Sequence, residues 1–106
     1  MDDRTRLELR FHAAMEDVYE QAARLGYRPT RFLQMVREYG GVEAAHRLLA
    51  TEAAQAGLTD LWLLGRLDLS MEYLVLSDEF VALFTDGERA IARERLAALG
   101  AVEAGA

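Results

Sequence analysis

Residues 27–57, with the sequence YRPTRFLQMVREYGGVEAAHRLLATEAAQAG, decide how this chain folds, because two helical patterns meet there at a pair of glycines. Large apolar residues recur at helical spacing over residues 30–39, and a second apolar stripe follows over residues 42–56. Between them lie Gly40 and Gly41, and glycine adopts the left-handed conformation that ends many helices without steric cost. We therefore expect two helices, hinged at the glycine pair, that fold back on each other or cross steeply.

Sequence signals for helix ends place the other boundaries. Capping boxes, in which a threonine and a glutamate three residues later satisfy each other's free backbone amides, are expected at residues 5–8 and 85–88. Thr30 is a candidate cap for the first hinge helix, and Ser70 or Asp68 for a short apolar segment. Gly57 is expected to end the second hinge helix.

The apolar pattern predicts helices along the whole chain. A stripe from Leu7 to Leu25 predicts an N-terminal helix of roughly 20 residues. Shorter helical segments are expected at residues 58–64, 71–76, 78–84 and 85–99, and the segment 71–76 is apolar nearly all round, as in a buried helix. We therefore predict an all-α fold, a single compact domain of six to seven helices, with a long N-terminal helix plus short helices around one core. The domain spans residues 1–106, with about 5–100 ordered and 101–106 a frayed tail.

The composition is that of an ordinary globular chain. Of its 106 residues, 52 % are hydrophobic and 28 % are charged, as in one domain with a single modest core. The sequence contains no run of about 18 apolar residues, the pattern that predicts a membrane helix. Its charged beginning, MDDRTRLELRF, does not resemble a secretory signal. The lack of cysteine excludes disulfides and is compatible with the cytoplasm, where we expect a soluble domain.

The net charge of −6 is unevenly distributed along the chain. Residues 1–50 are balanced, with eight arginines and eight acids, whereas residues 51–88 carry eight acids and a single basic residue, Arg66. An acidic chain attracts nucleic acid poorly, because contacts to phosphate supply most of the non-specific affinity. Nucleic-acid binding would therefore depend on a local basic face.

Glu43 and His46 are the candidates for a metal site, because they lie three residues apart on one predicted helix, a spacing used in carboxylate-bridged di-iron bundles. Such a site needs a partner row, and Glu8, His12 and Glu16 have a suitable spacing on the N-terminal helix. On a helical wheel, however, His12 lies about 120° from the centre of the apolar stripe, so this row is predicted to face solvent. We therefore expect no metal or other cofactor, and a partly buried, hydrogen-bonded His46.

Residues for covalent catalysis are scarce. The chain has no cysteine, no serine in a Gly-x-Ser-x-Gly turn and only two histidines. Neither a phosphate-binding glycine loop nor a dinucleotide fingerprint is present. The sequence therefore predicts no catalytic residue and a protein that is not an enzyme.

Residues 33–49 resemble a helix-turn-helix, a motif whose second helix reads the major groove of DNA. Arginines surround this segment, and the nucleic-acid candidates are Arg24, Arg28, Arg31, Arg37 and Arg47. The turn has one glycine more than the motif, and the expected outer face of the second helix, which includes Ala44, offers few groups that read bases. Nucleic-acid binding is therefore the alternative interpretation.

Tyr27, Tyr39 and Trp62 are the candidates for contacts with another protein. Aromatic residues such as Trp62 more often belong to the core, yet short helices this rich in apolar residues can leave a patch exposed. We therefore predict a non-catalytic module that contacts a protein partner or a second copy of itself. In such a contact, the arginine-rich region over residues 24–47 would dock against the acidic residues 51–88.

Three segments carry a resemblance to a known family. They are RFLQMVREYGGVEAAHRLL (residues 31–49), GRLDLSMEYLVL (residues 65–76) and LFTDGERAIARERL (residues 83–96). In this order they resemble an uncharacterised family of small all-α bacterial proteins, over residues 19–99. The resemblance implies a bacterial helical domain and implies no activity or binding residue.

Overall fold

The computed structural model describes residues 1–52 and 55–100. Over these residues the chain forms helices and no strand, which confirms the predicted all-α class. The α-helices are α1 (Asp3–Arg24), α2 (Thr30–Tyr39), α3 (Gly41–Leu49), α4 (Gln55–Leu63), α5 (Met71–Val75) and α6 (Asp86–Ala98), and the 3₁₀ helices are η2 (Leu67–Leu69) and η3 (Asp78–Leu83). The predicted frayed tail, residues 101–106, lies outside the described residues.

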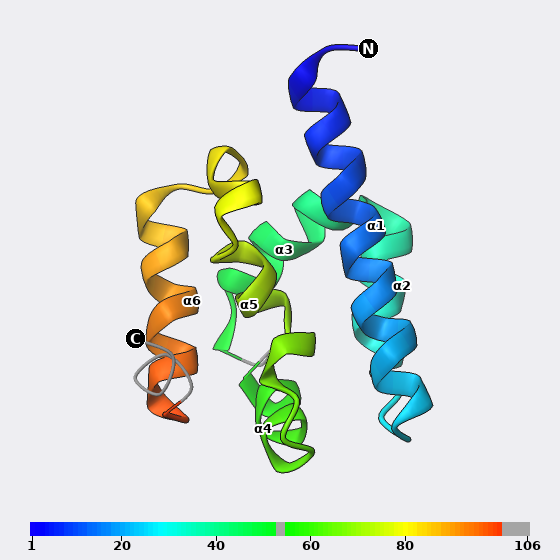
Figure 1. Ribbon diagram of the computed structural model, residues 1–106, viewed down its shortest axis with the longest axis vertical. Coiled ribbons are helices and arrows are strands. Elements are labelled where there is room, and N and C mark those ends of the chain that lie inside the picture. Colours follow the sequence, from blue (N-terminus) through cyan, green and yellow to red (C-terminus); the bar gives the residue numbers. More distant parts are fainter. Residues whose placement is uncertain (53–54, 101–106) are drawn as a thin grey trace.

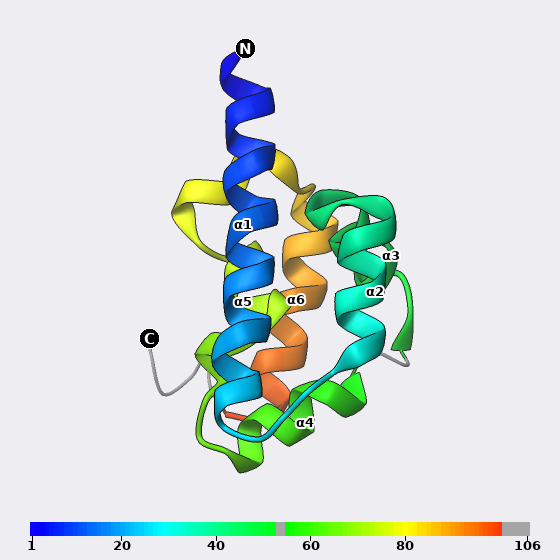
Figure 2. The ribbon, with the colours of Figure 1, turned by 90° about the vertical axis from the view of Figure 1, so that its right-hand side faces the viewer.

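The helices form a compact globule of 39 × 28 × 22 Å. α1 and α2 lie on one side, α3 and α5 lie in the middle and α6 lies on the other side, while α4 lies across one end (Figures 1 and 2). α1 contacts α2, α3 and α5, and α3 also contacts α2 and α6. In the described part of the chain, no helix combines the length and the apolar character that are needed to cross a bilayer.

The core centres on Phe11 of α1, which is fully buried. The ring centroids of Phe80 and Phe84 lie 5.0 and 5.1 Å from that of Phe11, both in edge-to-face geometry. The largest other apolar side chains that are fully buried are Met15, Val36 and Val75. A smaller cluster of Val18, Ala22, Leu61 and Leu69 holds α4 and η2 against the C-terminal half of α1.

The predicted hinge is confirmed, and its two glycines have different roles. Gly40 has a φ of 84°, a left-handed conformation that ends α2. Gly41 begins α3 and lies against α1, where a Cβ would stand 2.6 Å from the Cα of His12. The Gly41 amide donates a hydrogen bond to His12 Nδ1 at 2.9 Å. The glycine pair therefore both turns the chain and lets α3 cross close to α1.

Two of the predicted helix caps are wrong. α1 begins at Asp3 and is capped by Asp2, whose carboxylate accepts a hydrogen bond of 2.7 Å from the Thr5 amide. An aspartate at this position both accepts from a free amide and interacts favourably with the helix dipole, so it displaces the predicted box at residues 5–8. Pro29 stands at the cap position of α2, where no side chain caps the helix, so Thr30 does not have the predicted role.

Two other caps are confirmed. Thr85 and Glu88 form the capping box of α6, with hydrogen bonds of 3.1 Å from the Glu88 amide to Thr85 Oγ1 and 3.0 Å from the Thr85 amide to Glu88 Oε1. Ser70 Oγ accepts a 3.1 Å hydrogen bond from the Tyr73 amide and caps α5. These caps begin the helices that carry Glu72 and Arg95, two residues of the candidate site.

The predicted helix over residues 42–56 is wrong. α3 ends at Leu49, and α4 begins at Gln55 and contains Gly57, which therefore does not end a helix. The side chain of Arg95 in α6 donates hydrogen bonds to the carbonyls of Leu48, Leu49 and Thr51. A contact between distant parts of the chain thus supplies the carbonyl partners at the end of α3, although the local sequence favours a longer helix.

The prediction that residues 71–76 form a helix buried all round is also wrong. Met71 and Val75 are buried, but Tyr73 is 51 % exposed. The third buried side chain of α5 is the charged Glu72. α5 is therefore an amphipathic helix in which a carboxylate belongs to the buried side.

Candidate functional site

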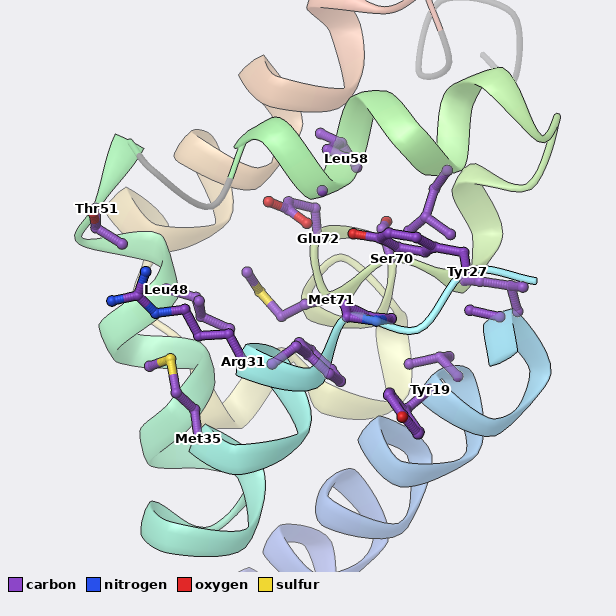
Figure 3. A pocket seen from close by; sticks show the side chains of 17 residues that line it. Tyr19, Tyr27, Arg31, Met35, Leu48, Thr51, Leu58, Ser70, Met71 and Glu72 are labelled. Atoms are coloured by element: carbon purple, nitrogen blue, oxygen red, sulfur yellow. The ribbon is translucent and has the colours of Figure 1, made fainter. Parts of the chain in front are cut away.

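A cavity of about 390 Å³ lies between α1, α2, α4 and the segment from η2 to α5 (Figure 3). Most of its wall is apolar, and it includes Val18, Ala22, Phe32, Leu58, Leu61 and Leu69. Its polar lining groups include the side chains of Tyr27, Ser70 and Glu72. An apolar cavity with a few convergent polar groups is typical of small-molecule sites, whose volumes are about 300–1,000 Å³.

The Glu72 carboxylate at this cavity forms a buried ion pair with Arg95. Arg95 Nη1 lies 3.1 Å from Glu72 Oε2, and both side chains are only 5 % exposed. The same guanidinium donates to the carbonyls of Leu48 at 3.1 Å, Leu49 at 3.3 Å and Thr51 at 2.7 Å. Arg95 therefore joins α6 to the end of α3 and to α5, and it fixes the position of Glu72.

Burial raises the pKa of Glu72 above its ordinary value. Hydrogen bonds from its own backbone amide and from Arg95, together with the charge of Arg95, favour the ionised form and oppose this effect without cancelling it. The carboxylate is thus held at a position where its ionisation is costly. It has about four acceptor sites when ionised, so it keeps acceptor capacity beyond the Arg95 bond.

Tyr27 faces Glu72 across the cavity, and its hydroxyl points toward the carboxylate (Figure 3). The hydroxyl packs against α4, because a Cβ at Gly57 would stand 2.8 Å from it. Within the described residues it forms no hydrogen bond. Its burial and the nearby charge of Asp60 raise the pKa of Tyr27, so the side chain stays neutral at physiological pH.

The metal candidates Glu43 and His46 line one hollow with Glu8 and His12 of α1, but in the described residues these side chains do not form a cluster that could hold a metal ion. Glu43 pairs with Arg47 across one turn of α3, with Nε 3.5 Å from Oε2. His46 instead contacts Glu88 of α6 and lies beside the ring of Phe84, so it is partly buried and hydrogen bonded, as predicted. Partial burial opposes ionisation of Glu88, but bonds from the Thr85 amide and from His46 hold its pKa below the ordinary value. Across residues 1–52 and 55–100, no group of three or more potential metal ligands is present.

The prediction that His12 faces solvent is wrong. Its ring is about two-thirds buried, Nδ1 accepts the Gly41 amide, and Nε2 lies 3.4 Å from Glu16. The helical wheel of α1 described only the stripe that faces the main core. The N-terminus of α3 crosses α1 on a second face, and it covers His12 there.

The candidate arginines do not form one face. Arg24, Arg28 and Arg31 lie around the connection from α1 to α2, whereas Arg37 lies near the other end of α2. Arg31 and Arg37 are six residues apart, which places them about 120° apart around the helix and roughly 9 Å along it. These four arginines are exposed, and within the described part of the chain they make no ion pair. Arg47 differs, because its guanidinium stacks 3.9 Å from the ring centroid of Tyr39.

α3, the would-be recognition helix, lies in the middle of the fold. It contacts α1, α2 and α6, and its residues Gly41, Ala44, Ala45 and Leu49 are buried. The expectation that Ala44 faces outward is therefore wrong. A helix covered on three sides offers a narrow surface to a DNA groove, since a recognition helix must insert its exposed face between the strands.

The C-terminal end of α4 exposes consecutive large apolar residues. Trp62 is 46 %, Leu63 71 % and Leu64 41 % exposed, although aromatic residues such as Trp62 more often belong to the core. Among residues 61–64, Leu61 is the one that is buried in the core. Of the other interface candidates, Tyr27 is half-buried in the cavity wall and Tyr39 is exposed beneath Arg47.

Glu72 and Arg95 were not among the residues predicted to form a site. They are 23 residues apart in the sequence, and each stands among other charged and apolar residues without a local signal. Comparison of the chain with protein-family models, with curated proteins and with solved structures gave no match. The resemblance to small bacterial helical proteins therefore stays a prediction.

Proposed function

We propose that this helical domain is a non-catalytic module that associates with a second copy of itself. The observation that carries the proposal is the run Trp62, Leu63 and Leu64 at the end of α4, which leaves three consecutive large apolar side chains exposed. A run of this kind is unfavourable on a free surface and is typical of an interface. We call these three residues the α4 patch.

The charges beside the α4 patch favour a second copy as the partner. Asp60 lies two residues before Trp62, and its charge acts on Tyr27, so the connection between α1 and α2 lies close to it. That connection carries Arg28, which is exposed and makes no ion pair within the described residues. In a two-fold symmetric contact each copy supplies both charges, so Arg28 of one copy is positioned to pair with Asp60 of the other.

This arrangement has the usual anatomy of a protein interface. An apolar centre of Trp62 and leucines is bordered by charged groups that stay near solvent. Tryptophan at the centre of an interface commonly carries much of the binding energy, because it buries a large area. We therefore assign most of the affinity to the α4 patch and the orientation of the two copies to Arg28 and Asp60.

Sedimentation velocity over a concentration series, from about 1 μM to 1 mM, tests the proposal. The protein should shift from monomer to dimer as its concentration rises, and Leu63→Glu should keep it monomeric, because a charge would be buried in the contact. Leu9→Glu is the matched control, since Leu9 is 53 % exposed on the N-terminal half of α1, at the other end of the molecule (Figures 1 and 2). A wild-type monomer over the whole range, or equal effects of the two variants, would refute self-association through α4.

Charge reversal tests the predicted orientation separately. Arg28→Glu and Asp60→Arg should each weaken the dimer about tenfold, because each places like charges opposite one another. The double variant should recover most of the wild-type affinity, since it restores opposite charges with the signs exchanged. Two losses that simply add would show that these residues do not meet in the dimer.

Nucleic-acid binding is the second candidate function. The observation that favours it is that Arg24, Arg28, Arg31 and Arg37 are exposed without ion pairs in the described part of the chain, so they are free to contact phosphates. Fluorescence anisotropy with labelled duplex DNA and single-stranded RNA, at about 50 and 200 mM salt, tests it. Binding that falls steeply with salt and is lost in Arg28→Ala/Arg31→Ala would support this function. Absence of binding at the lower salt would reject it.

A further inference from the structure

We propose that the cavity between α1, α2, α4 and α5 binds a small neutral molecule that has an apolar body and one hydroxyl group, of the alcohol or phenol class. The proposal rests on three features of the cavity: its size and apolar wall, the two polar groups that face each other inside it, and the charge balance of the buried ion pair. It is independent of self-association through the α4 patch.

The size and the wall of the cavity define the body of the ligand. A volume of about 390 Å³ corresponds to roughly a dozen water molecules at about 30 Å³ each, so it accommodates roughly ten non-hydrogen atoms of a ligand. Ala22, Leu58, Leu61 and Leu69 in its wall are all buried and apolar. An aromatic ring or a short branched chain of this size would bury much of its apolar surface there.

The polar groups of the cavity indicate that the ligand carries a hydroxyl group. Glu72 is 4 % exposed and its carboxylate accepts hydrogen bonds, while the hydroxyl of Tyr27 points toward it and forms no hydrogen bond within the described residues. A ligand hydroxyl between them can donate to the carboxylate and accept from the Tyr27 hydroxyl. Ser70 does not compete for the ligand, because its hydroxyl already donates to the Leu67 carbonyl and accepts the Tyr73 amide.

The ion pair defines the charge of the ligand. Glu72 and Arg95 already neutralise each other at 3.1 Å, with both side chains 5 % exposed. A cationic ligand would leave one buried positive charge in excess, and an anionic ligand would lie against the Glu72 carboxylate; either costs several kcal/mol of burial energy. A neutral hydroxyl adds a hydrogen bond without adding a charge.

The ligand has a route into the cavity. Arg31 and Thr51 line the cavity and are both exposed, so they mark its opening between the start of α2 and the end of α3. The Arg31 side chain extends toward Thr51 at this edge (Figure 3). A ligand can therefore enter at this exposed edge without opening of the core.

A matched pair of probes tests the proposal. 4-Ethylphenol and 4-ethyltoluene have the same shape, and only the first has a hydroxyl. Titrated into the ¹⁵N-labelled protein, 4-ethylphenol should shift the amide signals of Gly57, Leu58 and Ser70, which line the cavity. It should bind at least about tenfold more tightly than 4-ethyltoluene, because a hydrogen bond to a charged acceptor is worth about one order of magnitude or more.

Two variants assign the preference to the polar groups. Tyr27→Phe removes only a hydroxyl that is unpaired in the described residues, so the protein should fold normally. The ratio of its affinities for 4-ethylphenol and 4-ethyltoluene should fall by roughly threefold to tenfold. Glu72→Gln should reduce the preference further, and its thermal melt reports whether it folds. Tyr73→Phe is the matched control, because Tyr73 is 51 % exposed and does not line the cavity.

Several outcomes would overturn the proposal. They are no titratable shift with 4-ethylphenol at concentrations up to its solubility limit, shifts centred away from the cavity, or equal affinity for the two probes. A preference that Tyr27→Phe and Tyr73→Phe reduce equally would also overturn it, since the cavity hydroxyl would then have no special role.

Discussion

Replacing Arg95 by methionine removes one side chain that stabilises three helices at once. The guanidinium pairs with Glu72 of α5 at 3.1 Å and donates to the carbonyls of Leu48, Leu49 and Thr51 at the end of α3. Methionine keeps an unbranched apolar side chain in the same space, so the variant tests the polar contacts rather than the packing. We expect a large loss of stability.

The magnitude follows from the burial of the pair. Removing one partner of a buried ion pair leaves the other charge uncompensated, which costs about 3–5 kcal/mol. The carbonyls of Leu48, Leu49 and Thr51 also lose a donor in a buried or partly buried position, which adds to this cost. A loss of about 4 kcal/mol is a large part of the 5–15 kcal/mol that typically stabilises a domain. In a domain of about 100 residues it corresponds to a fall in Tm of roughly 15–30 °C.

Urea denaturation followed by circular dichroism measures this loss directly. Arg10→Met is the matched control, because Arg10 pairs with Glu79 at 2.9 Å while both side chains are more than half exposed, and it should cost at most about 1 kcal/mol. Adding Glu72→Met to Arg95→Met should recover about half of the loss or more, because no buried charge then remains. Equal effects of Arg95→Met and Arg10→Met, both under about 1 kcal/mol, would refute the role assigned to the pair.

Three further predictions concern local features of the fold. Gly41→Ala should cost about 1–3 kcal/mol in thermal denaturation, because its Cβ would stand 2.6 Å from the Cα of His12 and force two helices apart; an unchanged Tm would contradict this. Thr85→Ala should lower the free energy of unfolding by about 1 kcal/mol, because it removes the capping box of α6. Thr5→Ala should lower it by only a few tenths of a kcal/mol, because Asp2 rather than Thr5 caps α1. Equal losses would show that the caps are misassigned. Since burial raises the pKa of Glu72 in the folded state, its protonation stabilises the fold below about pH 4.5, and this contribution falls as the pH rises through the raised pKa. The free energy of unfolding of the wild type should therefore exceed that of Glu72→Gln by less and less as the pH rises through this range. Urea denaturation at several pH values measures this difference, and a constant difference would contradict the direction of the pKa shift.

Short-range signals in the sequence predicted much of the fold. Gly40, Ser70 and Thr85 end or begin helices as expected, because each needs only the backbone groups of its nearest neighbours. The stripe that contains Phe11 and Val18 likewise placed the long first helix on the core, since its spacing is a property of that helix alone.

Contacts between distant elements could not be predicted in this way. His12 looked solvent-exposed on the wheel of α1, and it is covered by α3 because Gly41 permits a close crossing. Arg95 and Glu72 were not predicted to pair, because the pattern of one helix cannot show that it buries a charge against another.

The candidate site was predictable only in fragments. Tyr27 and Arg31 were selected for a protein contact and a nucleic-acid contact, and the structure places both in the wall of the cavity. A cavity whose wall comes from segments between residues 18 and 72 has no signature in any one of them. Its shape depends on the packing of all the helices that surround it.

The position of Arg95 also determines when the fold can be completed during synthesis. Its four acceptor groups lie 23 to 47 residues earlier in the chain. A ribosome releases the N-terminal helices first, so α3 and α5 emerge while Glu72 has no counter-charge and must remain hydrated. A nascent chain that stops before residue 95 should therefore stay open to proteases instead of accumulating as a shortened domain.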